Sequence, residues 1–208
     1  MKYNLKKYGQ YKNDIFNKLD FPFKKGKNIL DVGCGDFSDA RIFYEYFGLE
    51  VYGIDIYEHD NKDNSLFLEF RKANIFEIPY PDNYFDYVFI HDVLHHIDEK
   101  NQEFEKHITG IRELKRVVKK DGTIIVIEGN RFNPLFYPHM VIMRRHNHWR
   151  QKYFKKVISC VFSKVDFKYF ESHLYPKKCF KFWKIYEFIM EKISPNKFLA
   201  YNVAIIRK

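Results

Sequence analysis

The stretch "ILDVGCGDFSDA", residues 29–40, decides the fold. Its apolar start predicts a short buried strand that ends near Asp31. Gly33 and Gly35 follow one residue apart, and they predict a sharp turn at which a ligand can approach bare backbone, because glycine has no Cβ. Ser38 or Asp39 is suited to begin the next helix. A strand, a Gly-x-Gly turn and a helix in this order are typical of ligand-binding α/β folds.

Outward from this turn, short apolar strands alternate with amphipathic helices. Strands that are apolar throughout are expected to be covered on both faces, so the pattern predicts βαβ units around a parallel sheet. The helix at 100–122 is expected to stop at Asp121-Gly122, and residues 65–75 are expected to hold a short helix and then the third strand. The predicted strands cover 28–32, 50–56, 85–93 and 123–130, and the other predicted helices cover the first 20 residues and 39–48.

The last third of the chain has a different character. Residues 133–162 are basic and predict helix, residues 164–176 predict a sixth strand, 179–193 an amphipathic helix, and 198–208 a final strand. Residues 1–130 hold 19 lysines and arginines against 23 aspartates and glutamates, a net charge of −4. Residues 131–208 hold 17 against 4, a net charge of +13. This division indicates that the second part faces an anionic partner, unless it is a solvated lysine-rich surface.

Composition limits the class of protein. A chain of 208 residues suits one domain with a sizeable core, which 22 Phe and 16 Tyr make strongly aromatic. No apolar run approaches the ~18 residues of a membrane span, and the first residues lack the apolar core of a secretory signal. Three cysteines without a CxxC pair favour a reducing cytoplasm and disfavour a structural zinc site.

The residues around the turn discriminate between ligands. The third glycine of a dinucleotide motif would fall at Ser38, which by itself does not exclude a dinucleotide. Asp31, however, would repel a pyrophosphate and attract an ammonium group. Asp55 ends the second strand, where a carboxylate can accept both hydroxyls of a ribose, and Asn74 follows the third. A nucleoside with a cationic amino-acid tail therefore fits better than a diphosphate.

Four stretches together closely resemble the class I S-adenosylmethionine-dependent methyltransferases of the type 11, small-molecule group. They are "ILDVGCG", "VYGIDI", "ANIFEIPYPDNYFDYVFIHDVLHHI" and "LKRVVKKDGTIIVIE", and they cover roughly residues 28–130. The resemblance implies a Rossmann-like, doubly wound α/β sheet of seven strands, mostly parallel, with one antiparallel strand near the C-terminus. It predicts a single methyltransferase domain over 1–208, made of an N-terminal helical segment (1–27), a cofactor-binding half (28–130) and a basic acceptor-side half (131–208).

The same resemblance implies S-adenosylmethionine as the cofactor and assigns residues to it. The glycine turn would line the methionine end, Asp55 would bind the ribose, and Ile56 and Asn74 would lie near the adenine. One departure is Phe37, which stands where many family members have a third glycine. The full set of expected cofactor residues is Asp31, Gly33, Cys34, Gly35, Asp55, Ile56, Asn74, Ile75 and His91.

His91 is the leading candidate for a catalytic base. It is the first polar residue after the apolar run 87–90, so it is expected at the strand tip, beside the crevice where ligands of open α/β sheets bind. Histidine accepts a proton near neutral pH without special tuning. Glu128 and His95 are the next candidates. His91 and His95 are four residues apart, but no third ligand is evident, so no metal site is expected.

The basic second half suggests the methyl acceptor. Arg144, Arg145, His148 and Arg150 are predicted to bind phosphate or carboxylate. The expected acceptor is an anionic small molecule or lipid-linked head group, methylated on O or N, with peripheral membrane contact left open. The alternatives are an RNA methyltransferase, for which arginines interleaved with aromatic residues suit nucleic acid, and a non-catalytic S-adenosylmethionine-binding module. A nicotinamide-dependent oxidoreductase is the most distant alternative.

Overall fold

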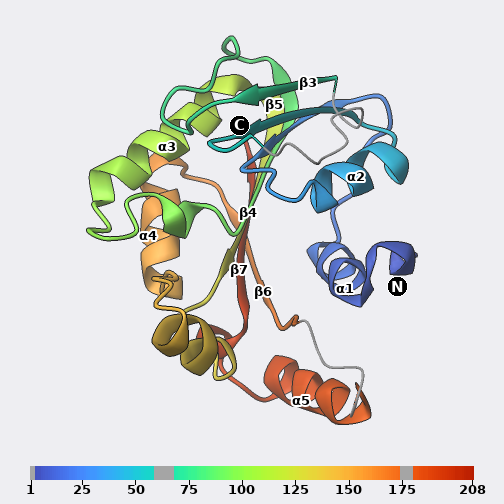
Figure 1. Cartoon of the computed structure of the whole chain (residues 1–208), viewed down its shortest axis with the longest axis vertical. Helices are drawn as coiled ribbons and strands as arrows, with labels where there is room; N and C mark the ends of the chain where they lie inside the picture. Colours follow the sequence, from blue (N-terminus) through green and yellow to red (C-terminus); the bar gives the residue numbers. More distant parts are fainter. Residues whose placement is uncertain (1–2, 59–67, 174–179) are drawn as a thin grey trace.

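Seven strands form one sheet in this computed structural model, which describes residues 3–58, 68–173 and 180–208 (Figure 1). The strand order is β3-β2-β1-β4-β5-β7-β6. β7 runs antiparallel to both β5 and β6, and the other neighbours pair in parallel. The predicted seven-stranded Rossmann-like sheet with an antiparallel strand near the C-terminus is confirmed. The strands are β1 (Asn28–Val32), β2 (Glu50–Asp55), β3 (Glu69–Lys72), β4 (Phe85–His91), β5 (Val118–Gly129), β6 (Asp166–Phe170) and β7 (Tyr201–Arg207).

Helices cover both faces of this sheet (Figure 1). On one face, Phe16 of α1 and Phe43 of α2 pack with Phe89 of β4 in one apolar core. On the other, α3 and α4 pack on the alternate strand residues, such as Val88 of the same strand. The central strands are apolar throughout because successive side chains enter opposite cores. The helices are α1 (Gln10–Leu19), α2 (Ser38–Glu45), α3 (Phe104–Val117), α4 (Gln151–Val161) and α5 (Phe180–Lys192).

Three expected boundaries were wrong. α3 ends at Val117 rather than at Asp121-Gly122, because Val118 already pairs with Phe85 of β4. β4 ends at His91, two residues before the expected end. Residues 133–162 are not helical throughout: a π-helical turn at Tyr137–Met143 is separated from α4 by an extended stretch around the buried Trp149. The helix expected within 65–75 falls partly outside the described residues, and β3 occupies its described part.

Phe37, the residue in place of a third glycine, has a structural role. Its φ of 62° lies in the left-handed region that glycine adopts easily. Its side chain is buried and packs against Phe70 with 5.8 Å between ring centroids. Its side chain is therefore part of the apolar core on this face of the sheet.

Candidate active site

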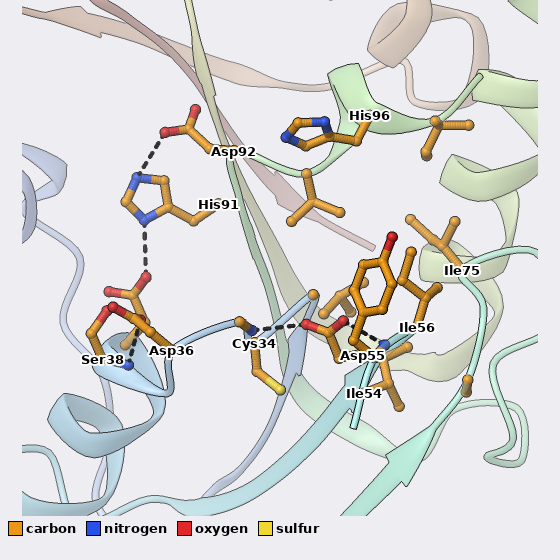
Figure 2. Close-up of a pocket in the computed structure, with 18 of the residues that line it drawn as sticks. Cys34, Asp36, Ser38, Ile54, Asp55, Ile56, Ile75, His91, Asp92 and His96 are labelled. Atoms are coloured by element: carbon orange, nitrogen blue, oxygen red, sulfur yellow. Dashed lines mark hydrogen bonds and ion pairs between the residues drawn. The ribbon is translucent and has the colours of Figure 1, made fainter. Parts of the chain in front are cut away.

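A cavity of about 1060 Å³ lies at the carboxyl ends of β1, β2 and β4. The turn after β1, the end of β2 and residues 73–76 form one part of its wall, and His91 and Asp92 form another (Figure 2). Residues 8–12, from the start of α1, also line it. The structure thus brings together the expected cofactor residues Gly33, Cys34, Gly35, Asp55, Ile56, Asn74, Ile75 and His91.

A side chain at Gly33, the first position of the glycine turn, would clash with its surroundings. Gly33 has a φ of +68°, and a Cβ built on it would lie 2.5 Å from Val93 Cγ2. Gly35 has a φ of +46°, with only the Gly33 carbonyl oxygen near its Cβ position, at 3.7 Å. The turn therefore presents bare backbone to the cavity. This is the local reason for the Gly-x-Gly pattern in the sequence.

Asp55 is held in place by the backbone around it. Its Oδ2 accepts a hydrogen bond of 2.9 Å from the Gly35 N–H, and its Oδ1 accepts one of 3.0 Å from the Tyr57 N–H. An ionised carboxylate has about four acceptor positions. Asp55 therefore has capacity for the hydroxyl groups of a ribose, in a fixed orientation.

Exposed apolar side chains gather beyond Asp55. Ile56 is 52% exposed and Phe76 is 37% exposed on the cavity wall, beside the buried Ile75. Asn74 lies at the same wall, and its Oδ1 accepts a hydrogen bond from the Phe76 N–H. Apolar surface with one oriented amide suits a planar heterocycle. The sequence reasoning missed Phe76, because nothing in its local pattern separates it from a packing residue.

Asp31 lies below the turn rather than on the cavity wall. It is 3% exposed, and its Oδ2 has no hydrogen-bond partner among the described residues. Burial, with Asp39 as a second cause, raises the pKa of the Asp31 carboxyl well above its usual range. A raised pKa favours the neutral carboxyl, and Asp31 does not line the cavity, so a cation bound at the turn would act on it only by favouring its ionised form.

His91 belongs to a buried ionic network. Its Nδ1 lies 2.9 Å from Asp39 Oδ2, which also pairs with Lys12 Nζ at 2.7 Å. Its Nε2 faces the Tyr11 hydroxyl at 3.3 Å. Burial alone would raise the pKa of Asp39, but Lys12 and His91 outweigh it and hold this pKa well below its usual range. No local pattern marked Lys12, Tyr11 or Asp39 as site residues, because each of them suits an ordinary amphipathic helix or its first turn.

Glu128 and His95 do not line the cavity, which corrects their assignment as bases. Glu128 is fully buried, and its Oε1 accepts hydrogen bonds from the N–H groups of Val93 and Leu94. Its Oε2 lies 2.8 Å from His95 Nδ1. Glu128 is therefore a positioning residue for the loop after β4.

The predicted anion-binding residues are not brought to the cavity. Arg144 and Arg145 are exposed at the end of the π-helical turn, and Arg150 is exposed with its guanidinium 5.2 Å from the Phe132 ring centroid. His148 is buried against His95 instead, with 4.1 Å between ring centroids. Arg144 and Arg145 follow a π-helical turn that has no buried residues, and Arg150 directly precedes α4.

Comparisons with known proteins agree with this geometry. Residues 30–126 match the family described as "Methyltransferase domain". The chain is 28% identical over 149 residues to demethylmenaquinone methyltransferase of Geobacillus kaustophilus (strain HTA426), covering 64% of this chain and 60% of that protein. It is 28% identical over 114 residues to phosphoethanolamine N-methyltransferase 2 of Caenorhabditis elegans, covering 50% and 24%. The chain thus spans less than two thirds of these relatives' lengths.

Solved structures show the same fold. A SAM-dependent methyltransferase from Archaeoglobus fulgidus superposes with a TM-score of 0.67 at 20% identity, covering 98% of this chain and 97% of that one. Haemonchus contortus phosphoethanolamine N-methyltransferase 2, solved with S-adenosyl-L-methionine, has a TM-score of 0.61 at 19% identity, with 96% and 53% covered. No helix within the described ranges is both long and apolar enough to cross a membrane. Residues 30–126 are therefore similar to the methyltransferase family, and the chain has the fold of the solved S-adenosylmethionine-dependent methyltransferases.

Proposed function

We propose that this chain is an S-adenosylmethionine-dependent methyltransferase that methylates O or N of a small molecule. One observation carries the proposal: a single cavity joins the glycine turn and Asp55 to the His91–Asp39 pair. The first part suits a nucleoside with a cationic tail, and the second is a base with an orienting carboxylate. A binding module would need only the first part.

Different residues of the cavity are expected to contact the three parts of the cofactor. The methionine end is expected at Gly33–Gly35 near Asp31, the ribose on Asp55, and the adenine beside Ile56, Asn74 and Phe76. When bound, S-adenosylmethionine supplies a methyl group that its sulfonium already activates. The protein's task is therefore to hold the acceptor in line with that methyl group and to exclude water.

His91 is placed to take the acceptor's proton. As the acceptor's lone pair forms a bond to the methyl carbon, the carbon–sulfur bond breaks, and the O–H or N–H proton must leave. With its Nδ1 proton donated to Asp39, His91 keeps a lone pair on Nε2 to receive that proton. Lys12 keeps Asp39 ionised, and this carboxylate stabilises the imidazolium that forms.

The charges on the cavity wall favour an amine as the acceptor. The wall carries Asp36, Asp92, Asp98 and Glu99 in addition to the network around His91. Among the described residues, Lys12 is the one lysine or arginine on this wall, and it is already paired with Asp39. Carboxylates attract a protonated amine and repel an anion. His91 would take the ammonium proton first, so that the nitrogen lone pair is free to attack the methyl carbon. We therefore propose an amine-bearing acceptor in place of the anionic one that the basic second half suggested.

The relatives' names support this choice in part. One acts on demethylmenaquinone and the other on phosphoethanolamine, which bears an amine. The acidic wall agrees with the amine group of the second compound, but not with its anionic phosphate group. The exposed arginines lie outside the cavity, so their charge does not bear on the choice of acceptor.

A turnover assay tests the proposal. The protein is incubated with S-adenosylmethionine and matched panels of small amines, alcohols and carboxylates, and S-adenosylhomocysteine and a product enlarged by one CH₂ are measured by mass spectrometry. We expect turnover with members of the amine panel and none with Asp55→Ala. Tight cofactor binding without any turnover would identify a binding module, and turnover confined to carboxylates or RNA would overturn the amine assignment.

A further inference from the structure

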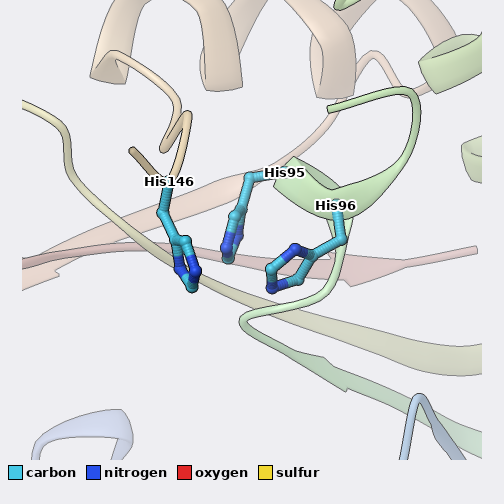
Figure 3. Close-up of side chains that lie close together, drawn as sticks. All are labelled: His95, His96 and His146. Atoms are coloured by element: carbon cyan, nitrogen blue, oxygen red, sulfur yellow. The ribbon is translucent and has the colours of Figure 1, made fainter. Parts of the chain in front are cut away.

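Four histidines meet beside the cavity, on two segments far apart in the sequence. His95 and His96 lie in the short helical turn after β4, and His146 and His148 lie between the π-helical turn and α4. We refer to these four residues as the histidine cluster. Its ring centroids are 4.0 Å apart for His95–His96, 4.1 Å for His95–His148 and 5.5 Å for His96–His146. Figure 3 shows the rings of His95, His96 and His146 side by side.

The ring nitrogens are close enough to share one ion. One nitrogen from each of His95, His96 and His146 lies within 4.8 Å of the other two. Asp92, His95 and His148 form a second such group, also within 4.8 Å. In a tetrahedral site with metal–nitrogen distances of ~2.0–2.1 Å, the ligand nitrogens are about 3.3 Å apart. Small side-chain rotations would bring the rings to that spacing.

His148 provides independent evidence for a ligand. It is 5% exposed, and neither of its ring nitrogens has a hydrogen-bond partner among the described residues. A buried polar group without a partner is costly. Histidine is the commonest metal ligand among protein side chains, so an ion bound at this cluster would offer a partner to such a ring.

His95 already has the second contact that metal-binding histidines require. Its Nδ1 faces Glu128 Oε2 at 2.8 Å, so its Nε2 is left for another partner. A carboxylate that accepts the other ring N–H fixes the orientation and tautomer of a metal-ligating histidine. Glu128 is itself held by two backbone N–H groups, which makes this orientation rigid.

We propose that the histidine cluster binds one divalent transition-metal ion, with His95, His96 and His146 as ligands and His148 packed against His95 beside the ion. An all-imidazole donor set suits zinc and neighbouring ions rather than magnesium or calcium. The ion would join the segment before α4 to the loop after β4, and His96 would place it at the cavity wall. This proposal does not depend on methyl transfer, because its evidence is the geometry and burial of the cluster.

Metal titration of the full chain tests this proposal. The protein is first treated with a chelator and dialysed, then titrated with ZnCl₂ by calorimetry and with CoCl₂ by visible absorption. We expect one ion per chain and the strong visible absorption of tetrahedral cobalt. His96→Ala and His146→Ala should each weaken zinc binding at least about a hundredfold, beyond the ~10–100-fold that loss of an outer-shell partner causes.

His139→Ala is the matched control, because His139 is an exposed histidine on the segment that carries His146. It should bind zinc as the unmodified protein does. His146→Asn, with circular dichroism and thermal unfolding in metal-free buffer, guards against a variant that merely fails to fold. Absence of zinc binding, or equal binding by His96→Ala, His146→Ala and the unmodified chain, would overturn the proposal and leave the cluster as packing.

Discussion

The backbone N–H of Gly35 donates a 2.9 Å hydrogen bond to Oδ2 of Asp55. This contact joins the turn after β1 to the end of β2, two positions 20 residues apart in the chain. The glycine turn and the carboxylate therefore form one rigid unit, in which each orients the other. Cofactor affinity is expected to depend on both.

Asp55→Ala should weaken S-adenosylmethionine binding by about 2–4 kcal/mol, because hydrogen bonds to a charged group contribute ~1.5–3 kcal/mol each and do not add fully. That corresponds to a roughly 30- to 1000-fold rise in Kd by calorimetry. Glu50→Ala, at the exposed opposite end of β2, is the control and should bind normally. An unchanged Kd for Asp55→Ala would show that the ribose lies elsewhere.

Gly33→Ala should destabilise the fold by about 3 kcal/mol, from left-handed backbone strain of ~1–2 kcal/mol plus the clash with Val93. Gly26→Ala is a matched control, because Gly26 has a φ of +73° and nothing within 4 Å of its Cβ position. In urea unfolding, Gly26→Ala should lose only the ~1–2 kcal/mol of stability that left-handed backbone strain costs. Adding Val93→Ala to Gly33→Ala should recover at least about 1 kcal/mol in a double-mutant cycle. Equal losses for the two glycines would mean that Val93 moves aside freely.

Asp31→Asn should stabilise the cofactor-free protein at pH 7–8. Burial raises the folded-state pKa of Asp31 above its unfolded value of ~3.9, so the wild type loses stability as pH rises from the unfolded pKa through the folded one. Asparagine does not titrate, so the variant avoids a loss of about 1.4 kcal/mol per unit of pKa difference. The extra stability of Asp31→Asn over the wild type should vanish near pH 4 and below.

Urea unfolding across this pH range measures the Asp31 effect. Asp121→Asn, at an exposed position near the start of β5, is the control and should show no such trend. A variant that is less stable than the wild type at pH 8 would show that the Asp31 carboxylate has a stabilising partner.

His91→Ala should lower kcat at least tenfold, within the ~10²–10⁴ that a positioned base contributes, with cofactor Kd changed less than about threefold. The acidic limb of the pH–rate profile should disappear, because the group that protonation inactivates is gone. Tyr11→Phe removes the hydroxyl 3.3 Å from Nε2 but leaves the base, so its acidic limb should remain. If His91→Ala kept the pH–rate profile of the wild type, His91 would not be the base, and catalysis would rest on holding the acceptor close to the methyl group.

Replacing Arg144, Arg145 and Arg150 together by glutamine should leave turnover of a small amine within about threefold of wild type, because none of the three lines the cavity. The same variant should adhere less to RNA at low salt, as expected for any basic surface. A tenfold rise in acceptor KM would instead return these arginines to the acceptor site.

The sequence by itself indicated a parallel sheet of apolar strands and several of the residues that line the cavity. Apolar strands, positive-φ glycines and a carboxylate at a strand end are local signals, because each depends on backbone conformation or on burial of neighbouring residues. Gly33, Gly35 and Asp55 could be assigned from such signals. The family resemblance then supplied Ile56, Asn74 and Ile75, and all of them line the cavity.

Only the tertiary structure decided the rest of the site. Lys12, Asp39 and His91 come from α1, α2 and β4, and the histidine cluster joins residues about 50 positions apart. Such contacts depend on which helix packs over which strand and on how the loop before α4 returns to the sheet. Local periodicity contains no information on those distances. For the same reason the charge of residues 131–208 suggested an anionic acceptor, whereas in the structure the three arginines are exposed outside the cavity and carboxylates line its wall.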